Sequence, residues 1–234
     1  MLSVFLSACS SSQVSDKTTT IEQELLQTLV NTTHMNTSKI HLLTKQLVQE
    51  QHWQKVFLGY QWLCLHTINN PNNYCTLMWS SAKQSNNDDI LFEAAATSYA
   101  FNKSSYWLQQ SQRYAKSTAQ QLILKTLQDI PLTNPQLSEL INYPKHYAQA
   151  LFLKGKLESD IALLHQAQAI FLQNKNWQKL GDVLLLSAKI ILSNQNHSKA
   201  SNYFHEAILY YDLANANNKL EFAINWGKVH GITR

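Results

Sequence analysis

The chain has 234 residues and a formal net charge of +4, from 19 basic and 15 acidic side chains. Only 15% of its residues are charged, below the roughly 25% of an ordinary soluble domain, which argues against a dedicated nucleic-acid-binding protein. Its five glycines and four prolines predict a fold with few tight turns and argue against sandwiches, barrels and glycine-rich nucleotide sites.

The N-terminus begins with a short apolar run, MLSVFLSA, that ends in small residues before Cys9. Such a run is typical of an export signal. The tetrapeptide Leu-Ser-Ala-Cys at 6–9 resembles the lipobox of bacterial lipoproteins. The resemblance implies that residues 1–8 are a signal peptide and that Cys9 is the first mature residue and carries acyl chains such as palmitate. The alternative is a buried or chance cysteine near a disordered end.

The same resemblance predicts where the protein is located. Acyl chains on Cys9 would anchor it to a bilayer without a spanning helix, because each buried methylene contributes about 0.8 kcal/mol. In bacterial lipoproteins a residue other than Asp after the lipidated cysteine implies sorting to the outer membrane, and here that residue is Ser10. Residues 9–20 are almost devoid of apolar side chains and predict a flexible tether. We therefore expect the folded part on the periplasmic face of a Gram-negative outer membrane.

Residues 21–130 show helical periodicity and predict a first group of helical hairpins. Asn87 or Asp88 is expected to cap the helix that starts at Ile90. The segment IPLTNP at 130–135 contains two prolines and predicts a boundary before a second group over 136–234. The expected helices of the first group are 21–33, 38–50, 51–68, 74–83, a long segment from residue 90, and 104–129.

Two further cysteines, Cys64 and Cys75, flank the turn-like segment NNPNN at 69–73. Two helices that fold back across this turn would bring the two sulfurs together. A disulfide that closes a loop of this length contributes roughly 3 kcal/mol in the chain-entropy model. The alternative is a pair of buried free thiols, because cysteine packs well as a small apolar residue.

The C-terminal region, 136–234, shows regular internal repetition. A three-residue pattern, a small residue followed by Lys and then by an aliphatic residue, occurs three times, and its copies begin at Gly155, Ala188 and Gly227. Twelve residues after Gly155 and Ala188 the sequence has an alanine, Ala167 and Ala200. Sixteen residues after them it has a phenylalanine, Phe171 and Phe204. The expected helices, joined by very short links that make neighbours antiparallel, are 144–157, 160–174, 176–193, 197–214 and 217–230.

This spacing resembles that of tetratricopeptide repeats, in which small residues let paired helices approach closely. The resemblance is good over 144–230 and looser before it. It implies an all-α fold, an array of antiparallel helical hairpins that forms a tetratricopeptide-like α-solenoid. The alternative is an irregular helical bundle of the same composition.

The sequence carries no recognisable catalytic or metal-binding motif. HExxH, paired Cys-x-x-Cys, Gly-x-Ser-x-Gly and phosphate-loop patterns do not occur in it. We therefore predict a protein that is not an enzyme, with no cofactor, no metal and no small-molecule substrate. Glu158 followed by Ser159 is similar to the Glu-Ser pair of lytic transglycosylases, so a peptidoglycan-acting envelope enzyme, or its regulator, is the alternative.

Three lysines, Lys156, Lys189 and Lys228, follow the small residues of the repeats. In tetratricopeptide-like arrays this position tends to face the inner groove, so the resemblance implies a row of positive charge that favours an acidic segment or a chain-terminal carboxylate. The alternative is three ordinary exposed lysines.

The predicted function is a protein–protein interaction scaffold, or an assembly or docking factor, for periplasmic or outer-membrane proteins. A chaperone-like holder of exported clients is a further alternative.

Overall fold

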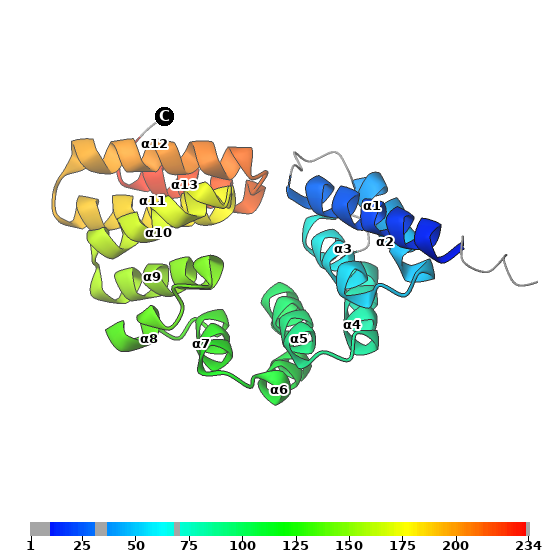
Figure 1. Cartoon of the computed structure of the whole chain (residues 1–234). Coiled ribbons are helices and arrows are strands. Elements are labelled where there is room, and N and C mark those ends of the chain that lie inside the picture. The colour runs from blue at the N-terminus through cyan, green and yellow to red at the C-terminus, as the bar shows by residue number, and fades with distance from the viewer. Residues whose placement is uncertain (1–9, 31–36, 68–70, 233–234) are drawn as a thin grey trace, which may run out of the picture. The chain divides into compact units, whose positions relative to one another are not determined.

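The structure is a computed structural model that describes residues 10–30, 37–67 and 71–232, with the side chains from residue 20 onward except that of residue 71. Within this part the chain forms thirteen helices and no strand (Figure 1). Within each unit most consecutive helices pack on one another, which confirms the all-α solenoid class. The chain divides into two compact units, Met1–Lys116 and Ser117–Arg234, each described separately below.

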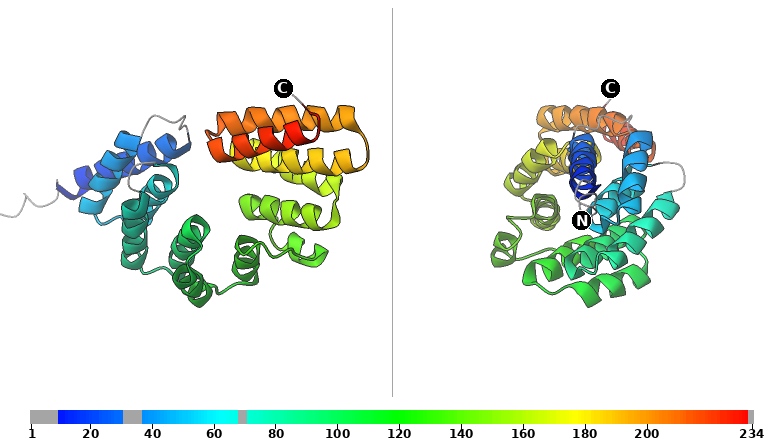
Figure 2. Two further views of the ribbon diagram at one scale, coloured as in Figure 1. Left: turned by 180° about the vertical axis from the view of Figure 1, so that it is seen from behind. Right: turned by 45° about the vertical axis from the view of Figure 1, so that its right-hand side comes forward.

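The first unit contains six helices, each packed against the next in chain order (Figures 1 and 2). Helix α3 also contacts α1 and α5, as expected for stacked hairpins. Its core is a continuous cluster of buried side chains that includes Leu25, Leu47, Leu63 and Met78. The helices are α1 (Ser10–Val30), α2 (Thr37–Gln49), α3 (Trp53–His66), α4 (Pro71–Gln84), α5 (Asp88–Asn102) and α6 (Ser105–Tyr114).

The start of α1 corrects the prediction of a flexible tether over 9–20. Helix α1 begins at Ser10 rather than at residue 21, so the segment 10–20 is helical. The segment contains no proline or glycine. It continues a helix whose Ile21 and Leu25 are buried in the core, so the costly helix nucleus already exists. The predicted signal peptide at 1–8 and the lipidation site Cys9 lie outside the described residues.

The two cysteines of the first unit form a disulfide, with an S–S distance of 2.04 Å between Cys64 on α3 and Cys75 on α4. Both side chains are buried. Helix α4 begins at Pro71, earlier than the predicted residue 74, so part of NNPNN is helical. Proline suits a first helical position because its φ is already helical and its missing N–H would be unpaired there.

The predicted helix over 104–129 is wrong, because the chain breaks between α6 and α7 (Thr118–Leu127). A capping box begins α7. The Gln120 N–H donates to the Ser117 hydroxyl (3.2 Å), and the Ser117 N–H donates to the Gln120 side-chain oxygen (3.0 Å). The first unit ends at Lys116 and the second begins at Ser117, so the predicted boundary at 130–135 falls inside the second unit.

The second unit contains the predicted repeats. The five helices expected over 144–230 match the observed ones to within one residue at every end. Each of these helices packs on the next. They follow α7 and the short α8 (Asn134–Ser138), and they are α9 (Pro144–Glu158), α10 (Ile161–Gln173), α11 (Trp177–Ser193), α12 (His197–Leu213) and α13 (Asn217–Val229).

Small residues lie where these helices come closest. A Cβ on Gly155 of α9 would lie 2.9 Å from a methyl of Leu164 on α10. A Cβ on Gly227 of α13 would meet the ring of Phe204 on α12 and would lie 2.7 Å from the Ile232 carbonyl oxygen. Glycine at these positions therefore permits the close helix contacts that the repeat pattern implies.

The links between helices are tight, although the glycine count predicted few tight turns. Eight non-glycine residues have positive φ, all between or just after helices of the described chain. In two links the residue with positive φ, Lys175 or Gln195, lies between two asparagines. The second asparagine, Asn176 or Asn196, then caps the next helix by accepting a backbone N–H. A left-handed conformation costs a non-glycine residue about 1–2 kcal/mol, and these helix caps offset that cost in the two links. The chain can therefore form tight links without glycine, so the prediction of few tight turns was wrong.

Candidate functional site

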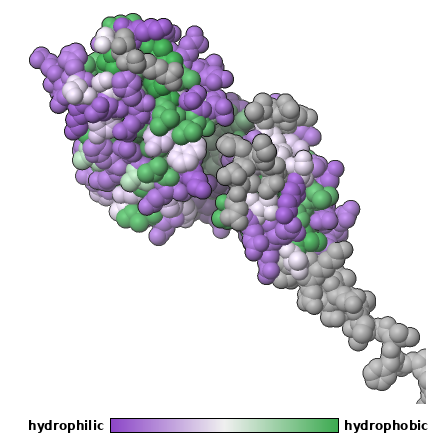
Figure 3. All heavy atoms as spheres, turned by 90° about the horizontal axis from the view of Figure 1, so that it is seen from above, coloured by the Kyte–Doolittle hydropathy of each residue, from purple (hydrophilic) through white to green (hydrophobic). Residues whose placement is uncertain are grey.

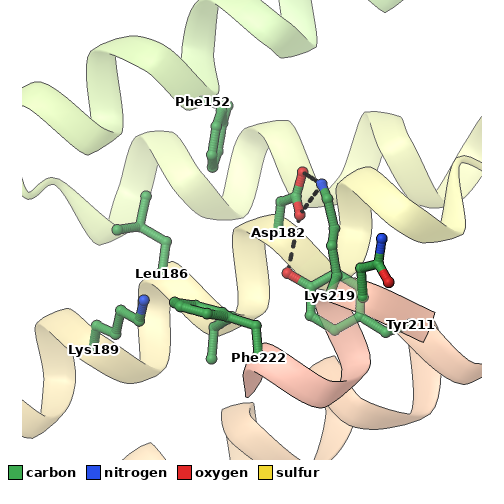
Figure 4. Close-up of a pocket in the computed structure, with 9 residues that line it drawn as sticks. Phe152, Asp182, Leu186, Lys189, Tyr211, Lys219 and Phe222 are labelled. Carbon is green, nitrogen blue, oxygen red and sulfur yellow. Dashed lines mark hydrogen bonds and ion pairs between the residues drawn. The ribbon is translucent and has the colours of Figure 1, made fainter. Parts of the chain in front are cut away.

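The candidate site is a pocket of about 340 Å³ in the second unit, between α9, α11 and α13 (Figure 4). These are alternate helices of the array, so each successive hairpin contributes its first helix to the same side. We call this site the unit 2 pocket. Its lining residues are Phe152, Asp182, Leu185, Leu186, Lys189, Tyr211, Asn218, Lys219 and Phe222.

One side of the pocket holds an ion pair that joins three helices. Asp182 on α11 accepts hydrogen bonds from Lys219 Nζ on α13, at 2.7 Å to each carboxylate oxygen. It also accepts one from the Tyr211 hydroxyl on α12, at 2.9 Å. Burial raises the pKa of Tyr211, and the Asp182 charge and hydrogen bond raise it further. Tyr211 therefore remains a donor, and the charge of Lys219 is balanced inside the protein.

The other side of the pocket carries positive charge that no described residue neutralises. Lys189 Nζ on α11 lies 4.9 Å from the ring centroid of Phe222 and 5.6 Å from that of Trp226, both on α13. Burial lowers the pKa of Lys189, and the charge of Lys156 on α9 lowers it further. Within the described chain neither lysine forms an ion pair with an acidic side chain. We call these two residues the Lys156–Lys189 patch.

The centre of the pocket is apolar. In Figure 4 Phe222 lies between Lys189 and Lys219, and Phe152 points toward it from α9. Leu186 on α11 also lines the pocket. Phe222 is 58% exposed, which is high for a large apolar side chain. Apolar patches interrupt the mostly hydrophilic surface in Figure 3. The unit 2 pocket thus combines an apolar centre, an ion-paired Asp182 on one side, with Lys219 at 2.7 Å and Lys179 at 3.9 Å, and on the other side a positive patch without an acidic partner.

The structure brings together part of the predicted lysine row. Lys189 lines the unit 2 pocket, and Lys156 is close enough to affect its pKa. Lys228 is exposed on α13 and is outside the set of lining residues. That these lysines bind a partner stays a prediction.

Asp182, which organises the opposite side of the pocket, was not predicted from the sequence. A signal was present, because Asp182 is the one acidic residue within the apolar α11.

The Glu-Ser pair lies at the C-terminal end of α9. The Glu158 carboxylate accepts a hydrogen bond from Lys154 Nζ at 2.7 Å, and its side chain is 45% exposed. Ser159 caps α9 in the left-handed conformation. Glu158 is outside the set of residues that line the unit 2 pocket.

Two searches of the described residues complete the description of the site. In residues 10–30, 37–67 and 71–232, no three His, Cys, Asp or Glu side chains are grouped so that they could hold a metal ion. The helices of this same part include none with both the length and the hydropathy needed to cross a membrane.

Fold and pocket together define an all-helical array of consecutively packed helices, compatible with a helical repeat protein. No protein-family model matches the chain, and no curated protein or solved structure shows significant similarity to it.

Proposed function

We propose that this protein is a lipid-anchored scaffold or docking factor on the periplasmic face of the outer membrane, and that it binds another polypeptide at the unit 2 pocket. The observation that supports binding is the pocket itself, where exposed Phe222 adjoins the unpaired charge of Lys189. Arrays of helical hairpins commonly bind extended segments along the side formed by alternate helices. Aromatic and cationic side chains are typical anchors of such interfaces.

Site-directed photo-crosslinking in the native cells tests this binding site. A photoreactive phenylalanine analogue at Phe222 would report contacts in the pocket, and the same analogue at Leu209 is the control. Leu209 is 55% exposed on α12 and is outside the set of lining residues. We expect one or a few discrete products from position 222 and none from 209. Equal labelling from both positions would contradict the proposal, and many unrelated products from 222 would instead indicate a holder of unfolded clients.

The membrane anchor is proposed from Leu6, Ser7, Ala8 and Cys9. Replacing Cys9→Ser removes the thiol that would be acylated, whereas Ser10→Ala retains it and serves as the control. Intact-mass measurement and cell fractionation should show that the serine variant lacks acyl mass and leaves the membrane fraction. If the Cys9→Ser protein keeps whatever added mass the wild type has and stays with the membrane, the proposal of an acyl anchor at Cys9 is refuted. The proposal for the unit 2 pocket is not affected by that result.

A further inference from the structure

We infer that the unit 2 pocket selects an extended segment in which an apolar side chain adjoins acidic side chains. The apolar side chain would pack on Phe152, Leu186 and Phe222, and a carboxylate would bind at the Lys156–Lys189 patch. This inference rests on the proposed function, because it specifies the chemistry of the partner that the pocket binds.

The charge of the patch supports an acidic partner. Burial removes part of the hydration of Lys189 and lowers its pKa, and the nearby charge of Lys156 lowers it further. A carboxylate between them would replace this repulsion by two attractive interactions and would restore a hydrogen-bond acceptor to Lys189. The aromatic rings of Phe222 and Trp226 hold the Lys189 ammonium in place, so little side-chain entropy is lost on binding.

The opposite side of the pocket cannot serve an acidic partner in the same way. Lys219 is already bound by both oxygens of Asp182, and Lys179 Nζ lies 3.9 Å from the same carboxylate, so both lysines on this side already have an acidic partner. The carboxylate therefore belongs on the Lys189 side, and Phe222 lies between the two sides (Figure 4). This arrangement places the apolar side chain of the segment at the centre and its acidic side chain at the Lys156–Lys189 patch.

The source of the carboxylate is expected to be Asp or Glu side chains rather than the end of a chain. A terminal carboxylate is best held by several donors that converge on one point. Here only the two lysines of the Lys156–Lys189 patch are available, because Lys219 is already held by Asp182. Two ammonium groups without further converging donors suit the carboxylate of a side chain that projects from an extended segment.

Fluorescence anisotropy with the purified full chain tests the inference. The probe is a fluorescein-labelled, C-terminally amidated peptide in which one leucine precedes two glutamates within a Gly/Ser-rich flank. One comparison peptide has both glutamates replaced by glutamine, and another has leucine replaced by serine. We expect saturable binding of the first peptide and affinities at least about threefold lower for the other two.

Matched variants of the protein locate the binding. Lys156→Gln and Phe222→Ser should each weaken binding of the Leu-Glu-Glu peptide at least about threefold. Lys199→Gln and Leu213→Ser are the controls, because both residues are exposed on α12 outside the pocket. All four side chains are exposed, and circular dichroism verifies that the variants stay folded.

Several results would overturn the inference. The first is equal affinity of the protein for the glutamate and glutamine peptides. The second is that no peptide binds. The third is that Lys156→Gln and Lys199→Gln change the affinity for the Leu-Glu-Glu peptide equally. Tighter binding of a leucine peptide that has a free C-terminus and no glutamate would also overturn it. If the peptides fail while position 222 still crosslinks to a discrete partner, the inference falls and the proposed function stands. If both fail, the pocket is not the binding site.

Discussion

Individual small residues determine how closely neighbouring helices of the array approach. Gly227 is completely enclosed between α13, the ring of Phe204 and the backbone at Ile232. Backbone atoms cannot move aside as a flexible side chain can. The glycine of the repeat pattern is therefore required by packing rather than by turn geometry.

Replacing Gly227→Ala should lower the free energy of unfolding by about 1–2 kcal/mol. Overpacking costs about 1–3 kcal/mol, and the better helix propensity of alanine returns at most about 1 kcal/mol. Urea unfolding measures the change. Asn225→Ala, at an exposed position of the same helix, is the control and should not lower stability. A Gly227→Ala protein as stable as this control would show that the α12–α13 contact is looser than described.

A second effect at the scale of single residues is the pH dependence caused by Tyr211. Its raised pKa means that the folded protein keeps the phenolic proton at pH values where the unfolded chain has released it. An unfolded tyrosine titrates at about pH 10. The stabilisation is thus complete below about pH 10 and declines above it.

Urea unfolding between about pH 8 and 11 should therefore show a free energy of unfolding that falls above about pH 10, with a contribution from Tyr211 of up to about 1.4 kcal/mol per pH unit. The Tyr211→Phe variant should show a shallower fall. Burial also raises the pKa values of Tyr60 and Tyr203, so these residues contribute to the pH dependence of stability in both proteins. The difference between the two pH profiles is therefore the contribution of Tyr211. Parallel pH profiles for both proteins would mean that Tyr211 ionises in the folded state as it does in water.

Among the helical elements, the α3–α4 pair has a covalent link. The Cys64–Cys75 disulfide closes a short loop, at a sequence separation of 11, and lies within the core of the first unit. Its main effect is to restrict the unfolded chain, so its contribution depends on loop length more than on local packing.

Removing both sulfurs with Cys64→Ala and Cys75→Ala together should lower the free energy of unfolding by about 3 kcal/mol. Alanine leaves no unpaired polar group in the core, and urea unfolding of the oxidised proteins gives the difference. A reducing agent provides the control, because it should destabilise the wild type and leave the double variant unchanged. A wild type that is indifferent to the reducing agent would contradict a structural role for the bond.

At the scale of the whole molecule, the chain is organised as two compact units, and the second begins at Ser117, the N-cap of α7. Every residue that lines the unit 2 pocket lies between 152 and 222, within the second unit. In an array of this kind each helix pair depends mainly on its neighbours, so the units are separable in principle.

A fragment that spans residues 117–234 should therefore fold by itself. We expect a helical circular-dichroism spectrum and a cooperative urea transition, because α9 to α13 bury their apolar faces on one another. The matching fragment 1–116 serves as the comparison. An unfolded 117–234 fragment would show that the second unit needs the first for stability.

The sequence predicted α9 to α13 closely, because each has an apolar stripe and a short link, which are local features. It did not predict the break between α6 and α7, because Ala115, Lys116 and Ser117 do not interrupt the helical period. The Ser117–Gln120 capping box was the available signal. The helical start at Ser10 was missed because composition indicates whether a segment is apolar, but not whether it continues a docked helix.

The pocket was only partly predictable. The repeat pattern indicated Lys156 and Lys189 as neighbours in the array, and the structure places their charges close together. It contained no information that Asp182 would pair with Lys219, which lies 37 residues away on another helix. It also did not show that Phe222 would lie beneath the Lys189 ammonium.

The amino-acid sequence by itself determined the all-helical class, the bounds of the last five helices and the cysteine pair, because these depend on periodicity and spacing along the chain. Only the tertiary structure decided which charges are balanced and which are left for a partner. The reason is that the energy of an ion pair depends on the distance between side chains remote in sequence, and that distance is set by how α9, α11 and α13 pack.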